Sequence, residues 1–173
     1  MIVAEAIINI YSMWQSSHGA NNIPSLYLLI VLEITLGGYF ILQSISKKAF
    51  KIIIASLIFI SVANTIYVSL INGNILTHNP LNRSLQGYFM VVFSLLYYYD
   101  LLKNKSIIRL TDDPTFWIIT AIFFYFGTTQ FLFLFIDFIY AYNPTIPKSL
   151  WKLHYFPSNV FYLLLAIGLW KKK

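Results

Sequence analysis

The chain has 173 residues, of which 58% are apolar, 18% aromatic and only 10% charged, and its formal net charge is +6. Soluble domains carry about 25% charged residues, and the basic residues here sit in short clusters beside apolar runs, so a soluble enzyme domain, a disordered chain and a nucleic-acid-binding protein are excluded. The absence of cysteine excludes disulfides, thiolate metal sites and cysteine catalysis.

Long apolar segments follow one another along the chain. A hydrocarbon core of about 30 Å needs about 20 helical residues to cross it. The first apolar stretch, Ile2–Trp14, reaches only about 20 Å and is either a short or tilted span or a helix lying in the membrane interface. Five longer segments predict full spans: Pro24–Ile45, Ala49–Ile71, Ser84–Leu102, Pro114–Ile139 and Trp151–Trp170. We therefore predict an all-α polytopic transmembrane helix bundle that forms one domain over residues 1–173, with five full spans plus a short N-terminal helix as candidate for a sixth.

Local signals predict where several of these helices begin. Asn22 or Ile23 precedes Pro24, and Asp113 precedes Pro114, which gives an N-cap candidate with proline at the first helical position. Ser84 follows Arg83, so we expect the third long span to begin at Ser84.

Lysine and arginine are distributed unevenly between the two ends of the predicted bundle. Cytoplasmic connections carry the excess of positive charge, so the carboxyl end is predicted to be cytoplasmic in a multi-pass protein of the bacterial inner (plasma) membrane. The amino end is also cytoplasmic if Ile2–Trp14 crosses the membrane, and outside if it does not. The basic residues assigned to the cytoplasmic end are Lys47, Lys48, Lys51, Lys103, Lys105, Arg109, Lys171, Lys172 and Lys173, and those assigned to the outer end are Arg83, Lys148 and Lys152.

Glu33 is an acidic residue within an otherwise apolar span. Ionisable groups inside a bilayer are costly and mark function by default. Counting 1.5 Å per helical residue places several amide residues at a similar depth, about 10–14 Å below the outer surface. Hydroxyl residues lie near the same level. We expect a ligand-binding pocket in the outer half of the bundle, with Glu33 at its centre and these residues around it: Asn64, Gln130, Asn159, Ser61 and Thr129, with Ser94 and Thr128 nearby.

Two interpretations of this polar layer are open. In the functional one, burial favours a protonated Glu33 that is hydrogen-bonded to Asn64, Gln130 or Asn159 and that binds a cation or polar ligand or carries a proton. In the structural one, the amides and hydroxyls join helices through interhelical hydrogen bonds. For Glu33 the functional role is favoured, because a residue that only joins helices need not ionise. Glu5 is expected near a helix end, facing water.

Residues with special backbone properties add two expectations. If the last helix begins near Trp151, Pro157 lies inside it, frees one backbone carbonyl and places irregular backbone beside Ser158 and Asn159, as at substrate sites in membrane helices. The alternative is that this helix begins at Pro157. Gly37-Gly38 and Gly127 are expected to permit close helix approach.

The histidines do not predict a metal site. His18, His78 and His154 all map to the outer side, and no spacing places two of them on one helical face. We therefore treat them as surface or interfacial residues and expect neither a metal nor another cofactor.

Three stretches carry a resemblance to a known group: Asn21-Asn22-Ile23-Pro24 running into Glu33, Asp113-Pro114-Thr115-Phe116-Trp117 running into Gly127, and Asn159 running into Ala166-Ile167-Gly168-Leu169-Trp170-Lys171. Together they cover most of residues 20–173 and resemble small, uncharacterised multi-span inner-membrane proteins of Bacteroidota, some of which resemble the membrane input regions of sensor histidine kinases. The resemblance implies signalling through a partner, because no kinase part is present in this chain, and it supplies no catalytic residues.

These observations favour a non-enzymatic sensor or partner-binding subunit. Its partners are expected to be the lipid bilayer, a membrane or cytoplasmic protein and further copies of itself, without nucleic acid, and its basic loops are expected to contact the partner or anionic headgroups. The alternative is a small oligomeric transporter, ion channel or membrane-perturbing effector of the defence type that uses Glu33 for ion or proton coupling, although no internal repeat is evident. An intramembrane enzyme is disfavoured, because no serine–histidine, paired-carboxylate or di-histidine arrangement occurs at usable spacing.

Overall fold

The computed structural model describes residues 2–71, 75–76, 79–104, 109–142 and 146–171, and within these ranges all regular structure is helical, as predicted. Two rods are continuous through a π-helical turn: α2, η1 and α3 form the first, and α4 and η2 form the second. The elements are α1 (Ile2–Ser17), α2 (Ile23–Leu32), η1 (Glu33–Gly37), α3 (Gly38–Ser44), α4 (Lys48–Ile66), η2 (Tyr67–Ile71), α5 (Pro80–Asn104), η3 (Leu110–Asp112), α6 (Pro114–Tyr142) and α7 (Ile146–Trp170).

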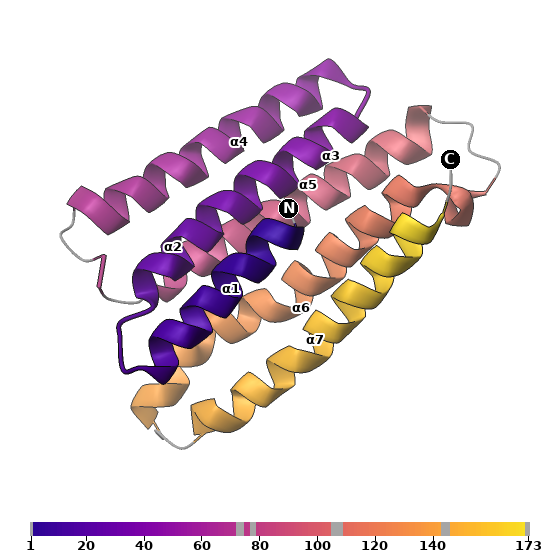
Figure 1. Cartoon of the computed structure of the whole chain (residues 1–173). Helices are drawn as coiled ribbons and strands as arrows, with labels where there is room; N and C mark the ends of the chain where they lie inside the picture. Colours follow the sequence, from indigo (N-terminus) through magenta and orange to yellow (C-terminus); the bar gives the residue numbers. More distant parts are fainter. Residues whose placement is uncertain (1, 72–74, 77–78, 105–108, 143–145, 172–173) are drawn as a thin grey trace.

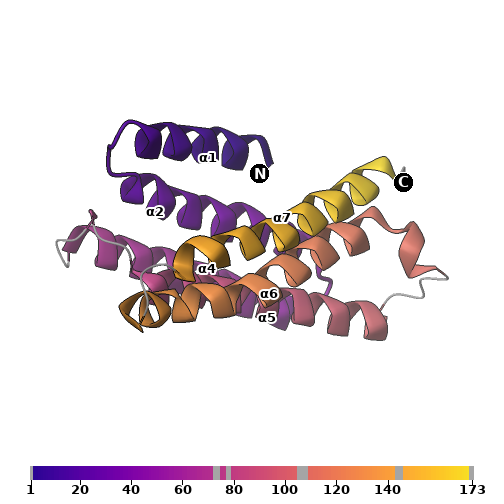
Figure 2. The ribbon, with the colours of Figure 1, turned by 90° about the horizontal axis from the view of Figure 1, so that it is seen from below.

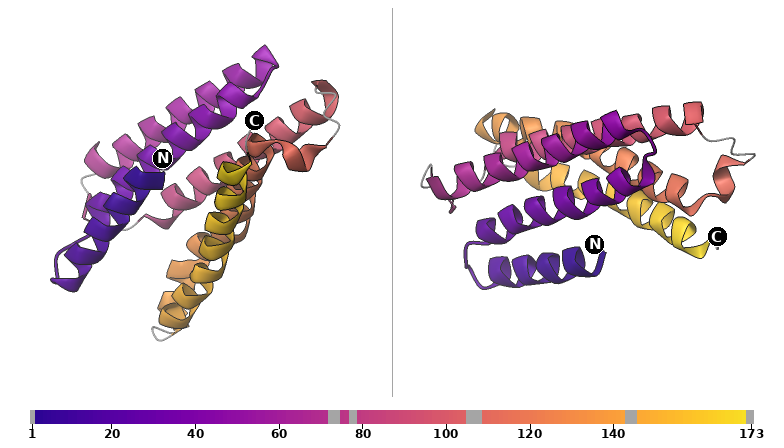
Figure 3. Two further views of the ribbon diagram at one scale, coloured as in Figure 1. Left: turned by 45° about the vertical axis from the view of Figure 1, so that its right-hand side comes forward. Right: turned by 90° about the horizontal axis from the view of Figure 1, so that it is seen from above.

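The rods run back and forth along one common direction, as Figure 1 shows. Helix α5 lies in the middle, where it packs against α3, α4 and α6, and α6 and α7 form the most extensive helix pair. The left panel of Figure 3 shows the α6–α7 hairpin splayed away from the rods α2–α3 and α4, with α5 between the two groups. This arrangement brings the beginnings of α2 and α5 to the same end of the bundle as the α1–α2 turn.

Three helical segments among the described residues have the length and hydropathy to cross a membrane: Ile23–Ser44, Lys48–Leu70 and Pro114–Leu132. They correspond closely to three of the five predicted spans. Helices α5 and α7 each have 25 residues, which is about 37 Å of helix at 1.5 Å per residue. Their crossing of a membrane stays a prediction, as does the total of five or six spans.

The predicted start of α5 at Ser84 is wrong. The helix begins one turn earlier, at Pro80, and the Asn79 side-chain oxygen accepts a hydrogen bond from the backbone N–H of Asn82 at 3.1 Å. Asparagine followed by proline is a regular helix start, because the amide oxygen satisfies an orphan donor and proline needs none. The consequence is that Arg83, which we had assigned to a loop, lies inside the helix.

The N-terminal stretch forms a helix of 16 residues, α1, that runs antiparallel to α2 on the outside of the bundle (Figure 2). It ends where Gly19 adopts a left-handed conformation, φ +71°, and where the Ala20 N–H bonds to the Gln15 carbonyl at 2.9 Å, a glycine-based C-terminal cap. The Ser25 hydroxyl also bonds to the Gln15 side chain at 2.6 Å, which joins α1 to α2.

The starts of α6 and α7 bear on two further predicted signals. The Asp113 carboxylate accepts a hydrogen bond from the Thr115 N–H at 2.9 Å and caps α6, as predicted. Helix α7 begins at Ile146 and runs without interruption through Pro157, so the alternative in which this helix begins at Pro157 is wrong.

The core and the surface of the bundle are both apolar. The core cluster around α5 includes Ile34, Ile54, Phe93 and Ile119, each fully buried. Large apolar side chains also cover the outside. Among them are Phe59 (75%), Leu102 (78%), Phe131 (61%) and Leu163 (61%). A water-soluble monomer rarely exposes so much contiguous apolar surface, so this exterior suits hydrocarbon.

Candidate functional site

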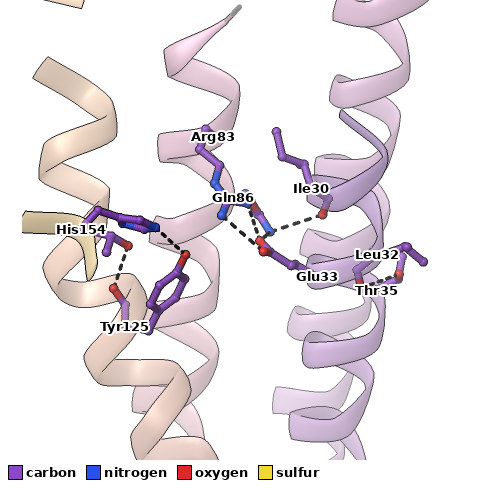
Figure 4. A network of polar contacts seen from close by, with 9 residues as sticks. Ile30, Leu32, Glu33, Thr35, Arg83, Gln86, Tyr125 and His154 are labelled. Carbon is purple, nitrogen blue, oxygen red and sulfur yellow. Dashed lines mark hydrogen bonds and ion pairs between the residues drawn. The ribbon is translucent and has the colours of Figure 1, made fainter. Parts of the chain in front are cut away.

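A buried ion pair joins α5 to the middle of the first rod. The Arg83 guanidinium contacts Glu33 in a forked arrangement, with Nη1 on Oε2 and Nη2 at 3.3 Å from Oε1. The Gln86 side chain closes the triangle: its oxygen accepts from Arg83 Nη1 at 2.8 Å and its nitrogen donates to Glu33 Oε2 at 2.8 Å (Figure 4). The Arg83 and Glu33 side chains are only 11% and 10% exposed, and Gln86 is fully buried. Each charge is therefore compensated inside the bundle.

Glu33 also begins a π-helical turn, η1, which changes the backbone hydrogen bonding beside the ion pair. A π turn loosens the regular ladder and occurs frequently at functional sites. Side chains bond to the nearby carbonyls: Gln86 donates to Ile30 at 3.3 Å, and the Thr35 hydroxyl donates to Val31 at 2.6 Å. The bonds from Arg83 and Gln86 hold the carboxylate of Glu33 toward α5.

The network extends from α5 to α6 and α7. Tyr125 places its hydroxyl beside Arg83 and 3.5 Å from Nε2 of His154, and the two rings meet edge to face (Figure 4). The Arg83 guanidinium also lies 6.0 Å from the centre of the Phe126 ring. Polar side chains from four rods, α2–α3, α5, α6 and α7, are thus connected around Arg83.

This network borders a pocket of about 360 Å³ between α1, α2, α5, α6 and α7. Its volume falls within the range of about 300–1,000 Å³ that small-molecule sites occupy. Apolar and aromatic side chains form most of its wall, and Glu5, Glu33, Arg83 and His154 bring ionisable groups to it. An apolar cavity with a few converging polar groups is the usual form of a ligand site.

Glu5 is one of the lining residues and is only 7% exposed. It lies in the first turn of α1, near a helix end as predicted, but the prediction that it faces water is wrong. Glu5, Asn9 and Ser12 all line the pocket, and their spacing of four and three residues places them on one face of α1. Its carboxylate lies within electrostatic reach of Glu33 and Arg83.

Of the six predicted ligand residues, Glu33 is the one that lines this pocket. Its expected partners are also different: Arg83 and Gln86 occupy the places that we assigned to Asn64, Gln130 or Asn159. The carboxylate is held in an ion pair, where we expected an uncharged group among amides.

Asn64 and Ser61 belong to a separate contact between α4 and α5. Asn64 donates to the Asn82 side-chain oxygen at 2.9 Å, and Thr65 donates to the same oxygen at 3.2 Å and to the Ser61 carbonyl at 2.9 Å. The Asn82 side-chain nitrogen is buried without a hydrogen-bond partner among the described residues. These groups join helices, as the structural interpretation expects.

The remaining candidates lie away from the pocket. Thr129 is buried and donates to the Tyr125 carbonyl of its own helix at 2.7 Å, while Gln130 is half-buried and packs beside Gly87 of α5. Asn159 is exposed on α7, although its neighbour Ser158 lines the pocket and donates to the His154 carbonyl at 2.9 Å. The predicted residues therefore do not form one chamber.

The prediction that the polar residues lie at a similar depth nevertheless agrees with where they contact α5. Asn64 contacts α5 at residue 82, Glu33 contacts it at residues 83 and 86, and Gln130 contacts it at residue 87. These positions span about 8 Å of helix axis. The polar residues therefore lie at a similar level along α5, but they contact different faces of this helix.

Histidines occupy different environments. His154 was expected to be a surface or interfacial residue, but it is half-buried in the pocket and does not lie on the surface. His18 is exposed and contacts the Trp14 carbonyl at 2.9 Å. His78 lies outside the described residues. No group of three acidic, histidine or cysteine side chains in the described ranges has the geometry of a metal site.

No family model, curated protein or solved structure matches this chain. The resemblance proposed from sequence therefore stays a prediction.

Proposed function

We propose that the protein is a non-enzymatic, multi-pass membrane protein that binds a small ligand in the pocket around Glu33 and signals its occupancy to a partner. The single observation that carries the proposal is the pocket itself: about 360 Å³, apolar walls, and a connected network of Glu33, Arg83, Tyr125 and His154 at its edge. The chemistry that these residues supply is recognition through charge and hydrogen bonding.

The apolar exterior of the helices supports placement in a membrane. We place all five long rods across it with the carboxyl end in the cytoplasm. Since Arg83 is paired inside the bundle, only Lys148 and Lys152 remain of the basic residues assigned to the outer end, and the bias that orients membrane proteins becomes stronger. The pocket then lies in the outer half, because Ile23 and Asn79, at the starts of α2 and α5, line it.

Signalling to a partner requires a cytoplasmic surface. The loop at the end of α3 and the last turn of α5 provide one: Lys47 lies 4.5 Å from the Phe50 ring and Lys103 lies 4.9 Å from the Tyr99 ring. Such a basic, aromatic surface suits an acidic partner segment or anionic headgroups. We propose that the protein acts as a homo-oligomer or as a subunit of a complex.

A pocket-filling variant with a matched control tests the proposal. Ser158→Trp places an indole in the pocket, whereas Asn159→Trp places it on the exposed side of the same turn. Each variant is purified with its surrounding lipids in polymer-bounded native nanodiscs, and the small molecules that accompany it are extracted and identified by mass spectrometry. We expect a molecule that accompanies the wild type and Asn159→Trp and is missing from Ser158→Trp. Identical extracts from all three would refute the pocket as a ligand site.

The same preparations separate a sensor from a transporter or channel. In liposomes with a trapped pH dye, a sensor gives no proton flux above that of empty vesicles. A flux that the wild type supports and Glu33→Gln abolishes would replace the sensor with the transport alternative.

A further inference from the structure

We propose that the ligand is a small organic cation, an ammonium group attached to an apolar body, and that Glu5 is the residue that recognises its charge. This inference rests on the proposed function, since it names the chemical class of the molecule that the pocket binds.

The ionisable groups of the pocket determine which charge a ligand must carry. Glu33 and Arg83 compensate each other through the forked ion pair. Gln86 and Tyr125 further occupy the guanidinium, so it offers an anionic ligand little. Glu5 is more than nine-tenths buried and adds a second carboxylate to the wall, so among the described lining residues two carboxylates share one guanidinium. Ionising this second carboxylate inside the bundle is costly without a counter-charge of its own, and a positively charged ligand supplies one.

The apolar wall of the pocket determines the chemistry of the uncharged part of the ligand. Apolar side chains line most of the pocket, and its aromatic residues can face a cation with their rings. Inorganic cations prefer several oxygen ligands, and the described residues contain no group of three acidic or histidine side chains suited to one. An organic cation satisfies both parts of the site, the second carboxylate and the apolar wall. The aromatic lining residues are Tyr27, Tyr125, Phe126, Tyr155, Phe161 and Tyr162.

The position of Glu5 suits a recognition residue. It lies on α1, which packs on α2 at the edge of the bundle, and Asn9 and Ser12 line the pocket from the same helical face. Replacing Glu5 therefore changes the wall of the pocket without breaking the Arg83–Glu33 contact.

Two probes of equal shape test the class of ligand. Phenyltrimethylammonium carries a positive charge, and tert-butylbenzene is its neutral isostere. Binding of each to the wild type in lipid nanodiscs is measured by equilibrium dialysis, with empty nanodiscs subtracted to correct for partition into lipid. We expect the cation to bind at least tenfold more tightly. Equal binding of the two probes, or binding of neither, would overturn the inference.

Variants then test the residue. We expect Glu5→Gln to weaken binding of phenyltrimethylammonium at least tenfold and to leave tert-butylbenzene unchanged. Asp112→Asn is the matched control, because it removes one negative charge from an exposed loop and should leave both affinities unchanged. Unchanged cation binding in Glu5→Gln would overturn the role of Glu5, and the two-probe comparison needs no variant to fold.

Failure of this inference is distinguishable from failure of the proposed function. If the neutral isostere binds as tightly as the cation, and Ser158→Trp blocks both, the pocket remains a ligand site and only the cation class is wrong. If Ser158→Trp loses no molecule that the wild type retains, the proposed function itself fails.

Discussion

The Arg83–Glu33 pair makes the strongest quantitative prediction, because both charges are buried and each is the counter-charge of the other. We consider three variants: Glu33→Gln, Arg83→Gln and the double variant. Each single change removes one charge and leaves the other in the bundle, at an exposure of 11% or 10%. The double change removes both and leaves amides that can bond to each other and to Gln86.

The magnitudes follow from the burial. Leaving one partner of a buried ion pair uncompensated costs about 3–5 kcal/mol. If the two sites were independent, the double variant would lose the sum, roughly 6–10 kcal/mol. Because the pair is a unit, we expect the double variant to lose less than either single variant, which corresponds to a coupling of more than about 3 kcal/mol.

Thermal unfolding in nanodiscs, followed by circular dichroism, measures these differences. For a chain of this size, a loss of 3–5 kcal/mol lowers the melting temperature by roughly 6–20 °C. The control is the exposed contact between Lys171 and Asp112, whose atoms lie 3.4 Å apart with side chains 37% and 61% exposed. Asp112→Asn should cost less than about 1 kcal/mol, because solvent screens such a pair. Additive losses in the double variant would refute the buried pair.

Three further outcomes are expected. Gly168→Ala should lower stability by about 1–2 kcal/mol, because an added methyl would lie 2.9 Å from Ile118 and 3.1 Å from a backbone oxygen. Gly127→Ala, whose added methyl would have its nearest neighbour at 4.0 Å, should raise stability by about 0.5–1 kcal/mol. Equal changes in melting temperature would contradict the packing of α6 on α7. Since the chain lacks cysteine, His18→Cys should react with an impermeant maleimide in intact spheroplasts and Thr111→Cys only after permeabilisation, and the reverse pattern would invert the proposed orientation. Pro157→Ala should raise stability by about 1–3 kcal/mol in a melting experiment, because it restores a backbone donor inside α7; no gain would mean that the helix already compensates for the proline.

Hydropathy predicted the rods well because a helix that lies in hydrocarbon must be apolar over its whole length. The first rod was expected at Pro24–Ile45 and is helical over Ile23–Ser44. Glu33 was also singled out from the sequence, and it contacts Arg83 and Gln86, since a lone carboxylate in such a rod needs a specific partner. Both predictions depend on the free-energy cost of placing a given side chain at a given depth in the helix, and the position of a residue in the sequence gives this depth directly.

Arg83 was missed because of an error in one helix boundary. The pair Asn79-Pro80 was the available signal: read as a cap with proline in the first turn, it would have started α5 one turn earlier. Arg83 then falls three residues before Gln86, on the same helical face. Glu5 had a similar signal, since Asn9 and Ser12 follow it at helical spacing and make one face of α1 polar.

The failure to group the amides has a different cause. A helix that is apolar on all sides carries no periodic pattern, so the sequence gives the depth of Asn64, Gln130 or Asn159 along its rod but not the direction in which each points. In the structure, Asn64 contacts Asn82 of α5, and Gln130 lies beside Gly87 on another side of the same helix. Asn159 is exposed on the exterior. Directions of this kind are set by packing between rods.

The two polar contacts of α5 differ in what they contribute. Neutral bonds such as Asn64–Asn82 are an economical way to join helices, because each partner that is removed costs little more than one hydrogen bond. An ion pair is a poor means of joining helices, because apolar residues of similar volume often stabilise a buried site at least as well. A double variant of Glu33 and Arg83 that folds with near wild-type stability would therefore show that the bundle does not need the pair. The position of these charges at the wall of a pocket would then be explained by what the pocket binds.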